Sequence, residues 1–279
     1  MLTETEFGGT LVDLGLAKAE AWGNQQSAYE RTLRLLRESP EQVFGVDKLR
    51  EAFKILPSAI VCMDEGVSLG DASATEIGIA GSGIFLTDEE VEQLAATIRA
   101  NRLPINSVTY HDACGAAGLF AAEHGFDPTV AARAAAKRLM RALRLEGDPV
   151  RVGYNGAPIA MDRDPRFHRN RAVIIDGTGR INAPILGLPA ALQLSARYYP
   201  SPHRLREEVA LAETIAMDPH GGFGERFTPD QPLLLILVGD ESNTSWDLTS
   251  LYDTLQSVLH REDERTLVVP LPIRQLRPL

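Results

Sequence analysis

The sequence predicts an α/β protein in which a mainly parallel β-sheet is covered by helices on both faces. Short apolar runs of strand length alternate with longer segments of helical periodicity, as in chains built from βαβ units. The 279 residues are 44% hydrophobic and 24% charged, which is the composition of an ordinary globular protein with a sizeable core. No internal repeat is evident in the sequence.

The predicted elements fall into two parts of the chain. Residues 1–56 predict a helical N-terminal extension, because apolar residues recur at helical spacings over 10–39 and a further short helix fits 46–56. Residues 57–279 predict the α/β domain. The extension is expected to pack on this domain or on a partner subunit.

Two short apolar runs, 58–61 and 107–110, predict neighbouring strands. A helix is expected between them, because Thr87 and Glu90 form a capping box at its start and an apolar stripe follows. Such a crossover helix places the strands that it joins in one parallel sheet. The carboxyl ends of these strands then face a common crevice, where α/β folds place their sites.

The rest of the chain continues the alternation of helices and strands. Helices are predicted at 115–123, 128–145, 189–199, 202–215 and 244–260, and strands at 150–155, 172–175, 233–239 and 266–271. The basic face of the 128–145 helix is interpreted as a solvated surface. His220 lies in a glycine-rich loop and is a candidate proton shuttle, although an ordinary connecting loop is the simpler interpretation.

Charge and hydropathy exclude several classes of function. The formal net charge of −10 argues against a general nucleic-acid binder and against binding to an anionic membrane surface. No apolar run approaches the roughly 20 residues that a membrane span needs. The first residues lack the basic region of a secretory signal, so a cytoplasmic location is predicted.

The chain has two cysteines, and both follow the strands described above. Cys62 ends the first strand, and His111 and Cys114 end the second. Two thiolates and one imidazole suit zinc or a close relative, and three protein ligands leave a fourth position open, as in catalytic zinc sites. The alternatives are buried apolar cysteines beside a core histidine, or a disulfide, which the lack of a secretory signal disfavours. We predict a metal centre.

The pattern of Cys62-x-Asp64 followed by His111-x-x-Cys114 resembles the metal signature of β-class carbonic anhydrases, Cys-x-Asp-x-Arg and His-x-x-Cys. Over roughly residues 57–200 the order of motifs is also similar to that of the cadmium-type (ζ) carbonic anhydrases. The resemblance implies a β-carbonic-anhydrase-like fold and reversible hydration of carbon dioxide to bicarbonate by hydroxide held on the metal. It implies Zn²⁺ as cofactor, with Cd²⁺ or another divalent transition metal as the alternative.

The resemblance also assigns roles to residues and partners. Cys62, His111 and Cys114 would hold the metal, and Asp64 would be the catalytic residue that accepts a hydrogen bond from the metal-bound water. Carbon dioxide and bicarbonate are the expected partners, with neither nucleic acid nor a membrane. Related enzymes make dimer contacts through N-terminal helices, so a homodimer through the helices of 10–39 is predicted.

One position departs from the family motif. Gly66 stands where the family has an arginine that pairs with the aspartate. Asp64 is then free to bind the metal and close the open position, or an arginine from 163–171 replaces the missing partner; we expect closure. Two other functions stay open. One is hydrolysis of carbon disulfide or carbonyl sulfide on the same scaffold, and the other is metal binding without turnover.

Overall fold

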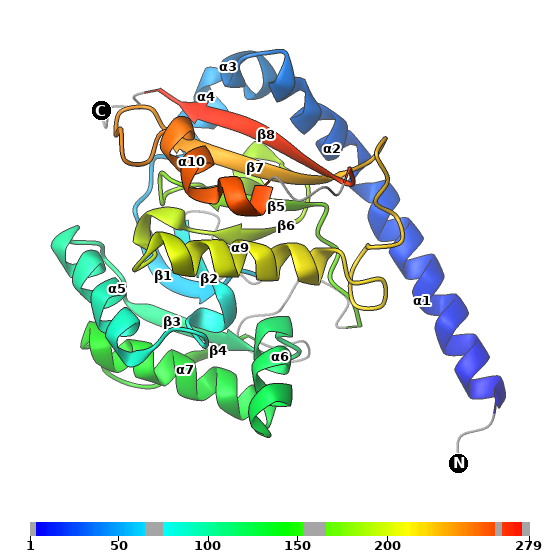
Figure 1. Cartoon of the computed structure of the whole chain (residues 1–279), viewed down its shortest axis with the longest axis horizontal. Helices are drawn as coiled ribbons and strands as arrows, with labels where there is room; N and C mark the ends of the chain where they lie inside the picture. Colours follow the sequence, from blue (N-terminus) through cyan, green and yellow to red (C-terminus); the bar gives the residue numbers. More distant parts are fainter. Residues whose placement is uncertain (1–3, 65–74, 153–165, 260–263, 275–279) are drawn as a thin grey trace.

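The computed structural model describes residues 4–64, 75–152, 166–259 and 264–274, with side chains from Asp13 onward. The described chain contains two four-stranded sheets, each entirely parallel and flanked by helices (Figure 1). The predicted α/β class is confirmed. The strands form two sheets, whereas the sequence predicts one.

The first sheet carries both strands that precede the cysteines, in the order β2-β1-β3-β4. Its strands are β1 (Pro57–Cys62), β2 (Thr75–Ile79), β3 (Ser107–His111) and β4 (Val150–Val152). Its helices are α5 (Asp88–Ala100), α6 (Gly115–His124) and α7 (Pro128–Leu143). Strands β1 and β3 are direct parallel neighbours, as the crossover argument predicts. Strand β2 was not predicted, because its short run lies in a passage of small residues.

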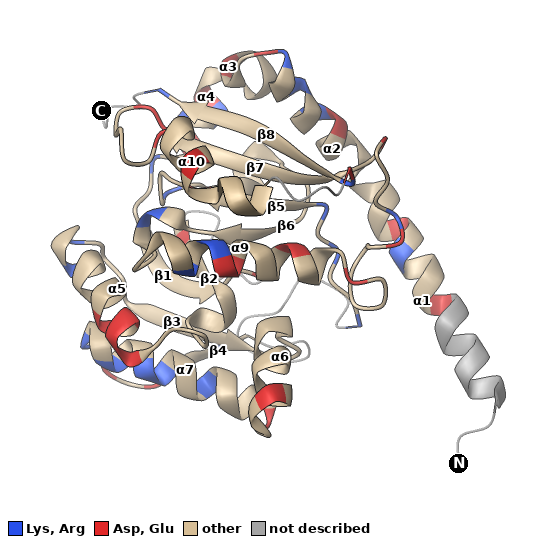
Figure 2. Ribbon diagram, viewed as in Figure 1, with Lys and Arg blue, Asp and Glu red and all other residues tan. Residues whose placement is uncertain are grey.

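The predicted capping box at the start of α5 is confirmed. Thr87 Oγ1 accepts a hydrogen bond from Glu90 N, and Glu90 Oε2 accepts one from Thr87 N at 2.8 Å. The basic residues of α7 have acidic neighbours within reach (Figure 2). Lys137 lies 2.8 Å from Asp148, and Arg138 lies 3.2 Å from Asp88. This face of α7 is therefore partly neutralised by the chain itself.

The second sheet repeats the strand order of the first, as β6-β5-β7-β8. Its strands are β5 (Ala172–Asp176), β6 (Ala191–Leu194), β7 (Leu233–Asp240) and β8 (Thr266–Ile273). Its helices are α8 (Ala183–Leu186), α9 (Pro202–Ala216) and α10 (Leu248–Leu259). In both sheets the first strand in the chain lies between the second and the third. The two halves thus share a topology although no repeat is evident in the sequence.

The two sheets meet where β2 and β6 approach one another. Gln193 N donates to Met63 O at 2.8 Å, and Ser195 N donates to Gly78 O at 3.0 Å. A Cβ added at Gly78 would lie 2.0 Å from the carbonyl oxygen of Gln193, so only glycine permits this approach. The junction places the second half directly beside the strand ends that carry the cysteines.

The helix predicted at 189–199 is wrong. This segment forms β6 and a short 3₁₀ turn, Ala196–Tyr198. The side chains of Leu192 and Leu194 are buried, whereas Ala191 and Gln193 of the same strand are half-buried, which is the alternation of a strand. Parallel pairing with β5 over the whole of β6 outweighs the helical preference of its alanine and leucine residues.

The N-terminal segment is helical and interrupted. It comprises α1 (Glu4–Asn24), α2 (Gln26–Leu33), a 3₁₀ turn (Arg34–Leu36), α3 (Pro40–Phe44) and α4 (Val46–Ala52). Buried residues of α2, α3 and α4 share a core with β5, β7 and β8. None of the helices in the described ranges combines the length and the hydrophobicity that a membrane crossing requires. The predicted homodimer stays a prediction.

One buried arginine fastens the N-terminal helices to the second sheet. The Arg171 side chain is fully buried, and its guanidinium lies 3.8 Å from the ring centroid of Trp22 and 3.9 Å from that of Tyr29. It donates to Trp22 O at 3.2 Å and to Gln26 Oε1 at 2.9 Å. Cation–π contacts of this kind reach about 2 kcal/mol when they are shielded from water.

We expect the variant Arg171→Met to unfold at lower urea concentration, with a loss of about 2–4 kcal/mol in the free energy of unfolding. Methionine fills part of the space, but it removes both cation–π contacts and leaves two partly buried acceptors, Trp22 O and Gln26 Oε1, without this donor. Equilibrium urea unfolding measures the difference. The control is Arg50→Met, because the Arg50 side chain is 63% exposed and its loss should change the free energy by less than about 0.5 kcal/mol. Equal stabilities of the two variants would contradict the anchoring role.

Candidate metal centre

The three predicted ligand residues lie at the carboxyl ends of β1 and β3. Cys62 is the last residue of β1, and His111 is the last residue of β3. Cys114 is the N-cap of α6, where its Sγ accepts a hydrogen bond from Ala117 N at 3.4 Å. A turn through Ala113, which has a φ of 51°, brings the cysteine back towards the strand end. All three ligand side chains are buried.

The structure brings these three residues together as a group that could hold a metal ion. One ligand atom from each of them lies within 4.8 Å of the other two. The Sγ atoms of Cys62 and Cys114 are 3.7 Å apart, and both cysteines are free thiols rather than a disulfide. Two sulfurs bound to one zinc at about 2.3 Å in a tetrahedral arrangement lie about 3.8 Å apart. The spacing of the sulfurs therefore fits a shared metal.

The imidazole of His111 is oriented for ligation through Nε2. Its Nδ1 lies 2.9 Å from the carbonyl oxygen of Asp112, so Nδ1 carries the proton and donates it to that oxygen. The buried Nε2 makes no hydrogen bond within the described structure. A metal-binding histidine usually donates one ring N–H to an acceptor such as a backbone carbonyl and binds the metal through its other nitrogen.

The cluster perturbs the pKa values of its own members. The neighbouring Cys114 thiol, together with burial, raises the pKa of Cys62 well above its ordinary value. Burial works to lower the pKa of His111, but Cys62 and Asp64 outweigh it, and the pKa of His111 is raised. A divalent cation among these groups would favour the thiolates and the neutral imidazole, which reverses both effects.

Asp64 is buried beside the three-residue group and contacts two histidines. Its Oδ2 lies 3.6 Å from His111 Nε2, and its Oδ1 lies 3.0 Å from His168 Nδ1. His168 was not predicted as a site residue. It belongs to the segment 163–171, from which an arginine was the alternative partner of Asp64, and it contacts the carboxylate as a histidine.

Two arginines of this segment, Arg166 and Arg171, have contacts with the N-terminal helices. Arg166 lies 2.7 Å from Asp13, and Arg171 is stacked between Trp22 and Tyr29. Gly66 and Arg163 fall outside the described residues. The candidate shuttle, His220, is exposed, and its backbone oxygen accepts a hydrogen bond from Lys18.

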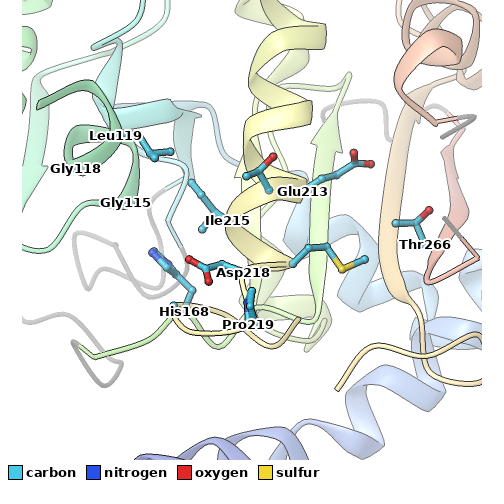
Figure 3. Close-up of a pocket in the computed structure, with 12 residues that line it drawn as sticks. Gly115, Gly118, Leu119, His168, Glu213, Ile215, Asp218, Pro219 and Thr266 are labelled. Carbon is cyan, nitrogen blue, oxygen red and sulfur yellow. The ribbon is translucent and has the colours of Figure 1, made fainter. Parts of the chain in front are cut away.

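A cavity of about 700 Å³ lies beside the candidate metal centre. His168 and Gly115, the residue after Cys114, line one end of it, together with the apolar side chains of Leu119 and Ile215 (Figure 3). The carboxylate of Asp218 points towards the imidazole of His168 in this view. The cavity therefore reaches the residue that contacts Asp64. The cavity lining comes from four separate parts of the chain, at 115–119, 168, 213–221 and 266, so no local sequence pattern marks the cavity.

Fold and site together define an α/β protein with a buried Cys-His-Cys group that could hold a metal ion. Comparison of the chain with protein-family models, with curated proteins and with solved structures gave no match. Assignment of a function therefore rests on the residues of the site and their geometry.

Proposed function

We propose that the protein is a metal-dependent carbonic anhydrase, which catalyses the reversible hydration of carbon dioxide to bicarbonate. The observation that carries the proposal is the meeting of Cys62, His111 and Cys114 at the ends of neighbouring parallel strands, with Asp64 beside them. These residues make up the signature by which the sequence resembles the β-class enzymes. Zinc is the proposed metal, and cadmium or another divalent transition metal is the alternative.

A metal bound at this group would supply a water molecule whose pKa is lowered towards about 7. The other tasks belong to the chain. Cys62, His111 and Cys114 hold the ion, and their burial keeps bulk water away from it. Asp64 is the nearby carboxylate and can accept a hydrogen bond from the reacting water, which orients it for attack on carbon dioxide. The His168 contact in turn holds Asp64 in place.

The cavity suits the entry of a small neutral substrate and the departure of an anion. Its apolar walls near Gly115 do not hinder carbon dioxide, whereas the negative charge of Asp218 disfavours the retention of bicarbonate. Its volume exceeds what carbon dioxide needs, so carbon disulfide and carbonyl sulfide also fit. Direct assays with these two compounds decide between the substrates.

The test is stopped-flow carbon dioxide hydration from pH 6.5 to 9, with the metal content measured in the same samples. The sequence alone predicts that Asp64 closes the metal position near neutral pH. Because Asp64 has a hydrogen-bond partner in His168, we instead expect activity already at pH 7. The variant Asp64→Asn should retain its metal and lose activity by about 10–100-fold, the usual effect of removing a group that supports a metal site. The control is Asp148→Asn, whose exposed side chain faces Lys137 at 2.8 Å and should change the rate by less than about twofold.

Two other outcomes are informative. Activity that appears only as the pH rises would show that the Asp64 carboxylate closes the metal position near neutral pH. A protein that binds metal but has no activity at any pH would overturn the carbonic anhydrase proposal and favour metal binding without turnover. Both outcomes can be read from the same pH series.

A further inference from the structure

The Asp64 carboxylate is shared between two histidines with different surroundings. Oδ2 faces Nε2 of His111 at 3.6 Å, and Oδ1 lies 3.0 Å from Nδ1 of His168. The Asp64 side chain is only 3% exposed, and that of His168 is 11% exposed. The hydrogen bond between His168 and Asp64 is thus shielded from water. A hydrogen bond to a carboxylate is stronger in such a buried place than at the surface.

The His168 ring is held from several sides. The backbone nitrogen of His168 donates to Gly221 O at 2.7 Å. This hydrogen bond fixes the backbone from which the imidazole extends. At the other end of the ring, a Cβ added at Gly115 would lie 2.9 Å from Nε2. Glycine at position 115 therefore leaves the space that the ring occupies. Three segments distant in sequence cooperate to place one imidazole against Asp64.

Without such a contact, the carboxylate is close enough to reach the metal. Asp64 Oδ2 is already 3.6 Å from the free ring nitrogen of His111, so a modest side-chain rotation moves an oxygen into the ligand group. Carboxylate oxygens bind zinc readily at about 2.0–2.2 Å. A fourth protein ligand would turn an open site into a closed one.

We propose that His168 is a positioning residue that keeps Asp64 off the metal and so preserves the open coordination position. The inference rests on the proposed function, because it assumes that a metal occupies the Cys62, His111 and Cys114 group. Nδ1–H of His168 donates to Oδ1, so the carboxylate is held through the oxygen that does not face His111. The family motif assigns the same task to an arginine two residues after the aspartate.

The test replaces the native metal with Co²⁺, whose visible spectrum reports the ligands around it without any assay of turnover. In the unaltered protein, added thiocyanate should enter the open position and change the spectrum. The variant His168→Phe fills similar space without a donor, so Asp64 should close the position and weaken the thiocyanate response at least about tenfold. His168→Asn keeps an N–H donor near the place of Nδ1 and should retain the response.

Two further variants separate positioning from general damage. The double variant His168→Phe with Asp64→Asn should regain the thiocyanate response, because a neutral amide is a poorer ligand than a carboxylate. Gly115→Ala should also weaken the thiocyanate response. The added methyl group would lie too close to the His168 ring and would displace the ring from Asp64. An unchanged response in His168→Phe, or no recovery in the double variant, overturns the positioning role.

Failure of this inference is distinguishable from failure of the proposed function. Expected cobalt spectra in a protein without carbon dioxide hydration would uphold the positioning role and refute the carbonic anhydrase. Normal carbon dioxide hydration, with an unchanged thiocyanate response in His168→Phe, would uphold the carbonic anhydrase and refute the positioning role. A chain that takes up no cobalt overturns both.

Discussion

Replacement of Cys114 by serine should lower the metal content from about one ion per chain to less than roughly a tenth of that. A hydroxyl is a much poorer ligand for zinc than a thiolate, and the group found among the described residues would keep Cys62 and His111 alone. Serine is also a preferred N-cap residue, so α6 should still begin at Gly115. The loss of metal can then be attributed to the missing thiolate rather than to unfolding of the helix.

Mass spectrometry of metals in the purified variant provides the measurement, and circular dichroism checks the fold. The control is His124→Gln, at the other end of the same helix, where the exposed imidazole bonds to the backbone of Phe120. It should keep its full metal content. Full occupancy in Cys114→Ser would refute the assignment of Cys114 as a ligand.

Ionisation of Glu208 should make the protein less stable as the pH rises from about 4.3 to about 7. Burial is the main cause that raises the pKa of this carboxyl to about 7, despite hydrogen bonds from Tyr199 and from Ala80 N. In the unfolded chain a glutamic acid has a pKa of about 4.3. Between these values the folded state keeps a proton that the unfolded state releases. The stabilisation is therefore complete below the lower value and is lost as pH rises through the higher one.

The size of the effect follows from the shift. The separation between the folded and unfolded pKa values, about 7 and about 4.3, corresponds to roughly 3–4 kcal/mol of unfolding free energy. Glu208→Gln keeps an acceptor and cannot ionise, so its stability relative to the native protein should rise by up to this amount between pH 5 and 8. Urea unfolding across that range measures it. The control is Glu123→Gln, because the Glu123 side chain is exposed. If the free energies of unfolding of the native protein and of Glu208→Gln changed in parallel with pH, the role of Glu208 would be refuted.

The sequence was sufficient for the ligand group because its signals are local. Cys62 and His111 each end an apolar run, and the capped helix between the runs implies that the two strands lie in one sheet. His168 had no such signal. Its contact with Asp64 depends on how the chain enters the second half and on the space at Gly115. No pattern of neighbouring residues records that arrangement.

The second sheet was harder to predict for a related reason. Strand β6 is only four residues long, and Ala191–Leu194 contains good helix formers, so local preference and the final structure disagree. Pairing with β5 and the hydrogen bonds across to Met63 and Gly78 decide the outcome. A single sequence does not show which strand will pair with which, so these long-range contacts could not be predicted from it.

The junction between β2 and β6 also bears on self-association. An unpaired strand edge invites other chains to pair with it, and the two halves cover this edge for one another. The outer strand β8 carries Pro270 and Pro272, two residues apart, so their nitrogens point to the same side. Because β8 pairs with β7 along its whole length, that side is the open one. Two missing N–H groups there make β8 a poor template for the growth of an intermolecular sheet.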